Sequence, residues 1–592
     1  MDQDTSSEQE TPPPPPKTKL GGWRAIAYIL VNETFEKVAS MSLIANMIVY
    51  LRTHYNLGGV FTVNVTTIWS GSSNITSLFG AFIADTFLGK YRTLLFGSIS
   101  SLLGMLGMTL TVSMPSLTPP KCKDLASNCP QPHKWQLAFL FVSLGFLSIG
   151  AGGIRPCNIA FGADQFDTRT PKIRATLEKF FNWWYFAFTI ALLIALTVVV
   201  WVQTNVSWIL GFVIPTLFLV ISISIFLIGR HTYIRKKPQG SIFIDMIKVI
   251  VASWKKRRLT ILPNYDPPLY DPPMDKANLH LKLDPTDRFK FINKAAMIAD
   301  PDEVDAQGKA KNTWRLCSLQ QVEELKCLVA IAPVWVSGIS CFIVMDQQSA
   351  FGILQAIQMN RQIGSHFEVP PAWMGLTSMI ALSTWILIYE ISSIHLAKRS
   401  TRKPSRLSFH QRIGIGIFMS ILCMIVAAIV EKERRGAALK HGTFVSPKSV
   451  AWLLPQFVLS GLVEAFAAIA VMEFYTTQMP ENMRTIAGAV FFISLSVASY
   501  ISSLLINIIH VVTKRKGGVP WLGGRDLNRN RLDYWYIIVA GLAVLNLLYF
   551  TFVASRFAKN QIHSSTAKNL IEDETDDEER GMEMRNTRTQ VE

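Results

Sequence analysis

Long stretches without a charged residue limit what this chain can fold into. The segments 94–112 and 208–229 contain no Asp, Glu, Lys or Arg. About 20 apolar residues in a helix cross the hydrocarbon layer of a bilayer, and a helix in a soluble core is seldom apolar on every face. Because 49% of all residues are hydrophobic and only 17% are charged, we predict an integral, all-α membrane protein.

The apolar windows fall into two groups of six, separated by a long polar interval. They lie at 26–52, 65–88, 93–114, 136–157, 180–203 and 207–229, and then at 326–346, 372–393, 410–430, 450–473, 484–509 and 534–556. They predict about twelve transmembrane helices in two six-helix halves, 23–229 and 326–558. In transporters, paired repeats of this kind enclose a binding site near the middle of the membrane.

Three segments lie outside the two halves. Residues 1–22 are polar and proline-rich, without the apolar core of a secretory signal, and 559–592 are acidic; we expect both to be disordered cytosolic tails. The linker 230–325 is too long for a simple connection. Within it, 243–258 has apolar residues at helical spacing beside a basic face, which fits a helix on the inner membrane surface. The linker is then either a mechanical link between the halves or a solvated tether.

The distribution of Lys and Arg predicts the orientation in the membrane. Most of the basic loops fall on one side, which is the cytosolic side in membrane proteins, so both termini are expected in the cytosol. The basic loop 513–531 lies on the other side, but late loops have less weight. The net charge of +16 therefore reflects topology and does not indicate nucleic-acid binding. We expect the plasma membrane rather than the vacuolar membrane.

The seven cysteines do not form the pattern of a disulfide framework, and no metal site is predicted. Cys122 and Cys129 share one short loop on the predicted outer side. They either form a disulfide there or remain free thiols.

Ionisable residues inside the predicted helices are few. Such groups usually face the interior of the bundle and line solute or proton pathways; the alternative is a buried ion pair that only fastens helices together. They are Glu33, Glu36 and Lys37 in the first helix, Arg155 at the end of the fourth, and Glu464 and Glu473 in the tenth. Asp85, Asp346 and Glu390 are expected near helix ends, close to water, and were not assigned to binding.

The first three charges lie on one face of a helix. Glu33 and Glu36 are three residues apart, and Lys37 is four residues after Glu33. Two carboxylates in a cavity of low dielectric compete for a proton while the ammonium group favours their charged forms, so the three titrate as a unit. This arrangement is suited to coupling a proton to the approach of another anion.

Six longer motifs resemble the plant nitrate/peptide transporter family, within the proton-coupled oligopeptide transporters of the major facilitator superfamily. The resemblance extends from about 22 to 558. The motifs are "GAFIADTFLGKYRT" (80–93), "GAGGIRPCNIAFGADQFD" (150–167), "FKFINKAAM" (289–297), "WRLCSLQQVEELK" (314–326), "HQRIGIGIFMS" (410–420) and "MEFYTTQMPENMR" (472–484). The resemblance implies the major facilitator fold, solute transport with the proton as coupling ion, and no other cofactor.

The resemblance also assigns roles to individual residues. "ETFEK" takes the place of the family's Glu-x-x-Glu-Arg proton-coupling motif, with Lys37 instead of arginine. Ser40 and Met41 stand where peptide-transporting members have two tyrosines, which argues against peptides. Arg155 takes the place of a lysine that pairs with the solute or with an acid, and Glu473 matches the acid that pairs with it.

Other positions are implied less directly. The region 332–342 lacks the histidine that binds nitrate in one relative, and Ser337 or Gly338 stands nearest. The aromatic residues Trp335 and Phe491 either line the cavity or pack in the core. Thr93 is either a site for a regulatory kinase or a helix cap. The glutamate–lysine variant, together with "GGIRPCN", looks most like the subgroup of low-affinity nitrate carriers and transporters of glucosinolates, other glycosides or hormones.

These features predict a proton-coupled symporter that imports an anionic solute. The candidates are nitrate or an organic anion or glycoside, such as a glucosinolate or a plant hormone. An uncoupled uniporter or channel is the alternative, and a sensor role is compatible with transport. An enzyme is not expected, because no His-x-x-x-Asp motif, paired-histidine metal site or Gly-x-Ser-x-Gly elbow lies in or beside a predicted helix. The expected partners are the small anion, protons and the lipid bilayer.

Overall fold

The computed structural model covers the two helical halves and most of the linker. The predicted terminal tails fall almost entirely outside the described residues. These are residues 21–120, 122, 129–166, 171–236, 238, 242–258, 268–272, 283, 285–286, 288–305, 308–364, 367–399, 407–479, 483–514 and 520–559.

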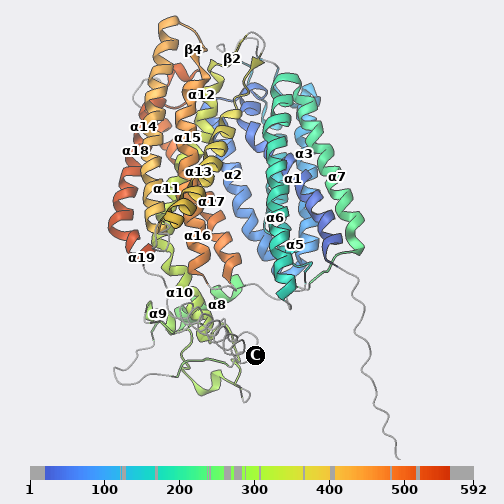
Figure 1. Cartoon of the computed structure of the whole chain (residues 1–592), viewed down its shortest axis with the longest axis vertical. Coiled ribbons are helices and arrows are strands. Elements are labelled where there is room, and N and C mark those ends of the chain that lie inside the picture. Colours follow the sequence, from blue (N-terminus) through green and yellow to red (C-terminus); the bar gives the residue numbers. More distant parts are fainter. Residues whose placement is uncertain are drawn as a thin grey trace, which may run out of the picture.

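The N-terminal half is a bundle of long helices, drawn from blue to green in Figure 1. A short helix, α5 (Asn158–Ala163), follows the fourth of them. The long helices are α1 (Trp23–Thr53), α2 (Gly59–Ile83), α3 (Lys90–Ser113), α4 (Lys134–Ile154), α6 (Pro171–Ile194) and α7 (Trp208–Ile228).

The C-terminal half repeats this pattern beside it. Its helices are α11 (Ala332–Gln347) with its extension α12 (Ile353–Ile357), α13 (Trp373–Arg399), α14 (Phe409–His441), α15 (Leu454–Val463) with α16 (Ile469–Gln478), α17 (Arg484–Lys514), and α18 (Leu532–Tyr549) with α19 (Ser555–Lys559). Four very short strands pair as β1 (Met359–Asn360) with β4 (Ser446–Ser449) and β2 (Gln362–Ile363) with β3 (Phe367–Glu368).

The prediction of an all-α membrane protein with two groups of helices is confirmed. Among the described residues, eight helices are long and apolar enough to cross a membrane, and a ninth is α11–α12 joined to the preceding α10 (Leu319–Ala330) at a bend of 41°. The other long helices are less apolar for a visible reason: α1 carries the charged cluster, and α2 is rich in Ser, Thr and Asn.

Helices of the N-terminal half approach each other through small residues. A Cβ atom added to Gly80 would overlap the carbonyl oxygen of Gly152, and one added to Gly150 would overlap the hydroxyl of Ser101. Backbones at this distance exclude larger side chains, as in other membrane helix contacts. The contact of α4 with α2 and α3 is therefore tight.

Several long helices contain π-helical turns. These turns are η1 (Ala84–Leu88), η3 (Ala195–Val199), η4 (Val202–Val206), η8 (Gln348–Gly352), η10 (Glu464–Ala468) and η13 (Phe550–Ala554). Such turns are often found at functional sites. η8 continues α11 into α12 without a break, so residues 332–357 form one helical segment.

The halves meet mainly along α2 and α17, which lie side by side over much of their length. Their contact is polar: Asn64 donates to Asn507 Oδ1 at 2.9 Å and accepts from the Ser503 hydroxyl at 2.8 Å. Nearer the middle, the Ser496 hydroxyl donates to the Gly71 carbonyl at 2.8 Å. Hydroxyl and amide groups, rather than ion pairs, join the halves here.

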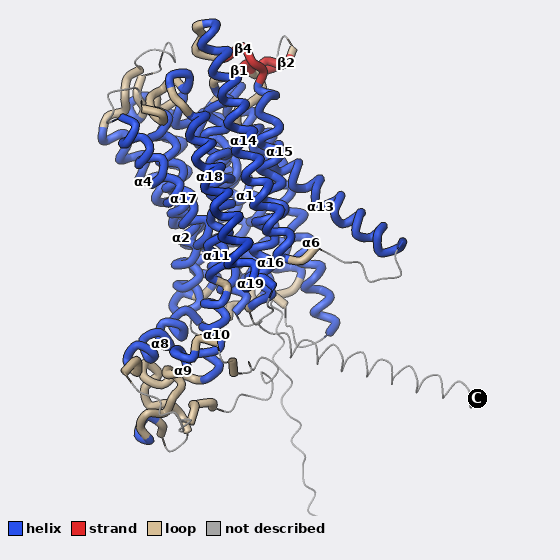
Figure 2. Tube along the Cα trace, turned by 90° about the vertical axis from the view of Figure 1, so that its left-hand side faces the viewer, coloured by secondary structure: helices blue, strands red, loops and turns tan. Residues whose placement is uncertain are grey.

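The predicted helix in the linker is observed as α8 (Ile242–Lys255). It packs with α9 (Lys290–Asn293) and α10, and its Met246, Val249 and Ala252 are buried among their apolar residues. These elements lie at one end of the molecule, here named the linker end, while the strands lie at the other (Figure 2). This part of the linker is thus a folded unit attached to α11. A mechanical role between the halves stays a prediction.

Candidate functional site

The three charges of α1 form one buried cluster. The exposed fractions of Glu33, Glu36 and Lys37 are 1%, 6% and 8%. Lys37 Nζ lies 3.2 Å from Glu36 Oε2 and 3.6 Å from Glu33 Oε1. The helical spacing predicted this grouping. The Lys37 side chain contacts both carboxylates and lies closer to that of Glu36, its neighbour in the sequence.

Asn158 binds the carboxylate of Glu33 from another helix. Its side-chain amide, at the start of α5, donates to Glu33 Oε2, and the asparagine is itself buried. Glu33 is therefore held by both Asn158 and Lys37, whereas Glu36 has the lysine as its ionic partner. The sequence reasoning missed Asn158, although it stands within the longest family-like motif.

Arg155 follows the last turn of α4, and its side chain reaches the space between the halves. Its Nη1 donates to Asn74 Oδ1 at 2.7 Å. It lines two neighbouring cavities. The larger, of about 200 Å³, lies between the halves, and the smaller, of about 30 Å³, extends to Glu36 and Ser40. The guanidinium group thus stands between the α1 cluster and the cavity that both halves share.

The larger cavity is mostly apolar. Both residues at the positions of the family's tyrosine pair face cavities: Met41 the larger, Ser40 the smaller. Residues of α1, α2, α6, α11 to α13 and η3 line the larger one, among them Met41, Ile44, Ile48, Trp69, Leu192, Leu196, Ile353 and Met379.

Asp346 contributes a carboxylate to the larger cavity from the C-terminal half. Its Oδ2 accepts a hydrogen bond of 2.8 Å from the Ser499 hydroxyl on α17. The expectation that it lies near a helix end, close to water, was wrong, because the helical segment continues through η8 to Ile357. The polar residues Gln347, Gln348 and Ser349 ended the apolar window early and concealed the true length of the helix.

The predicted pair of Arg155 and Glu473 does not form in this conformation. Glu473 Oε2 accepts instead from Arg412 Nη1 at 2.6 Å, within the C-terminal half. Its side chain is 47% exposed. Arg412, at the start of the neighbouring helix α14, is closer to Glu473 than Arg155 is, because Arg155 belongs to the other half.

Four other candidate residues do not line either cavity. Ser337 is fully buried, and its carbonyl accepts from Asn546 of α18 at 3.0 Å. Trp335 packs against the core clusters of the C-terminal half, and Phe491 packs edge-to-face on Phe342 with ring centroids 5.5 Å apart. Glu464 begins the π-helical turn η10. For Trp335 and Phe491 the packing alternative therefore holds.

Thr93 lies in the first turn of α3 and is buried. Its hydroxyl donates to the carbonyl of Gly89 at 3.1 Å, and Gly89 is the cap residue. Thr93 is thus not the helix cap, and its hydroxyl is enclosed in this conformation.

A second buried ion pair lies in α14, outside the cavities. Glu431 and Arg434 are both 0% exposed, and Arg434 Nε and Nη2 each lie 2.8 Å from a different Glu431 oxygen. Gln355 donates to Glu431 Oε2 at 2.7 Å, and Arg434 donates to Asn528 Oδ1 at 2.8 Å. Neither residue was among the candidates predicted from the sequence, because the apolar window 410–430 ends before this pair.

Cys122 and Cys129 form a disulfide, and the described free thiols are all buried. Within the described part of the chain, no group of His, Cys, Asp and Glu side chains is arranged to hold a metal ion. The ionisable groups at the site are the carboxylates of Glu33, Glu36 and Asp346, the Lys37 ammonium group and the Arg155 guanidinium group.

Comparison with known families decides the class of protein. The sequence profile of the POT family, PTR2, matches residues 91–522. The chain belongs to the POT family. It is thus a multi-pass membrane transporter and not an enzyme. Among POT-family relatives, Protein NRT1/PTR FAMILY 2.8 of Arabidopsis thaliana is 56% identical over 94% of this chain and 99% of its own length. Protein NRT1/PTR FAMILY 2.12 of the same plant is 43% identical over 91% and 92%.

Solved structures agree with this POT-family assignment at the level of the fold. The POT family transporter PepTSo covers 90% of this chain and 99% of its own, with a TM-score of 0.66 and 18% sequence identity. At that identity the likeness concerns the fold alone, and the solute must be argued from the cavity.

Proposed function

We propose that this POT-family transporter is a proton-coupled symporter for an anionic solute, with Arg155 attracting the anion. The main support is the setting of that guanidinium group. It lines a cavity inside the membrane, and its hydrogen-bond partner among the described residues is the neutral amide of Asn74. A charge within a membrane protein is costly unless it is compensated. The carboxylate of Glu36 interacts electrostatically with Arg155, and a bound anion would supply the compensation when Glu36 is protonated.

The carboxylates on either side of Arg155 support proton coupling. Glu36 lines the smaller cavity and Asp346 the larger one. We assign Glu36 as the main proton carrier, because it reaches a cavity while Glu33 is held by Asn158 and Lys37. Protonation of Glu36 would remove one of the two anions that compensate Lys37, and a nearby solute anion would then be favoured. This is the link between the two events.

The apolar walls bear on which anion is carried. Nitrate would use only Arg155 and the polar groups, whereas an organic anion or glycoside would also bury an apolar body against Met41, Ile44 and Leu196. We therefore favour an organic anion, such as a hormone or a glucosinolate, over nitrate. Dipeptides fit less well, because Ser40 and Met41 offer no aromatic hydroxyl.

An uncoupled uniporter is the second candidate. It is supported by the position of Lys37, which lies within 3.6 Å of both glutamates and so favours the charged form of each without any proton. The proposal also includes the orientation of the chain in the membrane and the identity of that membrane. The disulfide lies at the end opposite the linker, and disulfides persist in oxidising compartments, which supports cytosolic termini and a plasma-membrane location. We retain no kinase site at Thr93 for this conformation.

Uptake into proteoliposomes tests the proposal. Labelled nitrate, glucosides and plant hormones are offered to the full-length protein at outside pH 5.5 and 7.5, with the membrane potential clamped. A coupled symporter accumulates one of these solutes above its outside concentration only when the outside is acidic. A uniporter equilibrates it at both pH values.

Variants of Arg155 test the anion site in the same assay. Arg155→Ala should raise KM by about 10- to 100-fold, the effect of losing one hydrogen bond to a charged group. Arg155→Lys should retain part of the affinity, since it keeps the charge. Arg529→Ala removes a 78% exposed arginine and serves as the matched control. Unchanged KM in Arg155→Ala would show that the anion binds elsewhere.

A further inference from the structure

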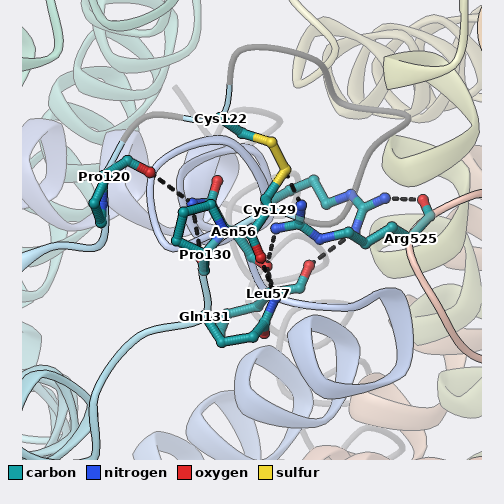
Figure 3. Close-up of a disulfide and its surroundings, with 9 residues drawn as sticks. Asn56, Leu57, Pro120, Cys122, Cys129, Pro130, Gln131 and Arg525 are labelled. Carbon is teal, nitrogen blue, oxygen red and sulfur yellow. Dashed lines mark hydrogen bonds between the residues drawn. A yellow bond between two sulfur atoms is a disulfide. The ribbon is translucent and has the colours of Figure 1, made fainter.

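The end of the molecule opposite the linker is closed by one loop from each half. The loop 54–58 joins α1 to α2, which begins at Gly59, and the loop 520–531 precedes α18. The Gly59 amide donates to the Gly524 carbonyl at 2.7 Å across the two halves. The Arg525 guanidinium donates to the Asn56 carbonyl, and the Arg52 guanidinium donates to the Arg525 carbonyl (Figure 3). Backbone carbonyls of each half are thus bound by an arginine of the other.

Asn56 depends on the disulfide loop for its position. It is fully buried, with a left-handed φ of 52° that few residues other than glycine adopt. Its side-chain amide donates to the carbonyls of Pro120 and Pro130, at 3.0 and 3.1 Å. Gln131 in turn donates to the Asn56 carbonyl at 3.4 Å and to the Cys129 carbonyl at 3.2 Å. Both hydrogens of the Asn56 amide are therefore bound by residues that flank the disulfide.

The disulfide holds these acceptors together and also contacts the other half. Cys122 and Cys129 follow Pro120 and precede Pro130, and the bond between them fixes their Cα atoms 5.2 Å apart. Arg525 Nη1 lies 3.6 Å from Cys122 Sγ. Arg525, which binds the Asn56 carbonyl, thus also contacts the disulfide (Figure 3). Loss of the disulfide would make both the acceptors of the Asn56 amide and the position of Arg525 less ordered.

We propose that the Cys122–Cys129 disulfide is a site of thiol–disulfide exchange that controls how readily this end of the transporter opens. The reductant is a thiol of the outer compartment. A thiolate attacks Sγ of Cys122, the less buried of the two, and Cys129 leaves as a thiolate. A second thiol cleaves the mixed disulfide, so two thiols become one disulfide and the protein gains two Cys thiols. The Arg525 guanidinium beside Cys122 attracts the incoming thiolate.

Reduction has a defined structural consequence. Once the bond is cleaved, Pro120 and Pro130 are no longer held at one spacing, and the Asn56 amide loses its fixed acceptors. The Asn56 carbonyl then offers Arg525 a less ordered partner, and the contact between Gly59 and Gly524 breaks more often. The oxidised form favours the closed end, and the reduced form shifts the equilibrium toward opening there. This inference rests on the proposed orientation of the chain, and it does not depend on which solute is carried or on proton coupling.

Hydrogen exchange of the full-length protein in lipid nanodiscs tests the proposal, with and without dithiothreitol. The Gly59 amide should exchange about fivefold faster after reduction, the factor expected from one lost hydrogen bond. Amides at the linker end, such as Thr93, which donates to the Gly89 carbonyl, should not change. A mass shift on maleimide labelling counts the reduced thiols in the same sample.

Three variants separate the steps. Cys122→Ser/Cys129→Ser should exchange at the fast rate with or without dithiothreitol. Arg525→Ala should raise exchange at Gly59 while the disulfide stays intact, and Arg529→Ala, which alters an exposed arginine of the same loop, should not. Unchanged exchange at Gly59 in fully reduced wild-type protein would overturn the proposal. Equal acceleration at Gly59 and Thr93 would also overturn it, because the disulfide would then support overall stability only. The wild-type comparison decides even if the double variant does not fold.

Discussion

The buried pair in α14 allows a prediction whose size follows from the structure. Arg434→Gln removes the guanidinium that donates to both oxygens of Glu431 at 2.8 Å. Both side chains are 0% exposed, so Glu431 would be left as an unpaired buried charge. Breaking such a pair costs about 3–5 kcal/mol. For a folding unit of roughly 150–250 residues, that lowers Tm by about 6–20 °C.

The double variant Glu431→Gln/Arg434→Gln is the informative comparison. It removes both charges and retains an acceptor for Gln355 and a donor for Asn528, which are the neutral partners of the pair. We expect it to be more stable than Arg434→Gln alone, with a coupling of at least about 1–2 kcal/mol. Thermal unfolding in nanodiscs measures this double variant and the two single variants, Glu431→Gln and Arg434→Gln. If the double variant loses as much free energy of unfolding as the two single variants together, the two charges are not coupled and the reasoning fails. Because neither residue lines the cavities, KM of the double variant should equal that of the wild type.

Three further predictions concern transport. Glu36→Gln should lose acid-driven accumulation yet keep counterflow across the vesicle membrane, whereas Lys37→Ala should lose both; accumulation by Glu36→Gln with an acidic outside would show that the proton travels elsewhere. Asp346→Asn should weaken the dependence of uptake on outside pH at least about tenfold more than Glu473→Gln does. The reason is that Glu473 pairs with Arg412 outside the cavity. Equal effects of the two variants in a pH series would contradict the role given to Asp346. Dipeptides should be poor substrates, and robust dipeptide uptake at micromolar concentration would contradict the assignment of Ser40 and Met41.

The sequence predicted those features that depend on local patterns. The two groups of helices follow from apolar windows, and the cluster of Glu33, Glu36 and Lys37 follows from the spacing of one helix. Partners on other elements were harder. Arg412 is nearer to Glu473 than Arg155 is, and only the packing of α14 against α16 determines this.

Polar residues inside helices produced the other errors. Hydropathy windows ended at 346 and 430, where glutamine, serine and charged residues begin, although both helices continue beyond those points. Asp346 was therefore placed near water, and Glu431 and Arg434 were left out. Buried polar groups are stable only when their partners are in place, and those partners come from distant parts of the chain, such as Ser499 and Asn528.

The π-helical turn η8 separates two tasks of one helical segment. Asp346, before it, faces the cavity, while Gln355, after it, binds Glu431 and accepts from the Tyr536 hydroxyl at 3.0 Å. A π turn contains one residue more than an α turn. The extra residue is taken up within the turn, so Asp346 and Gln355 face as they would on an α-helix one residue shorter. An α-helix that kept all the residues of this segment would rotate Gln355 by about 100° relative to Asp346. Within this segment, the π turn as well as residue identity therefore determines which side chains face the cavity and which maintain the core.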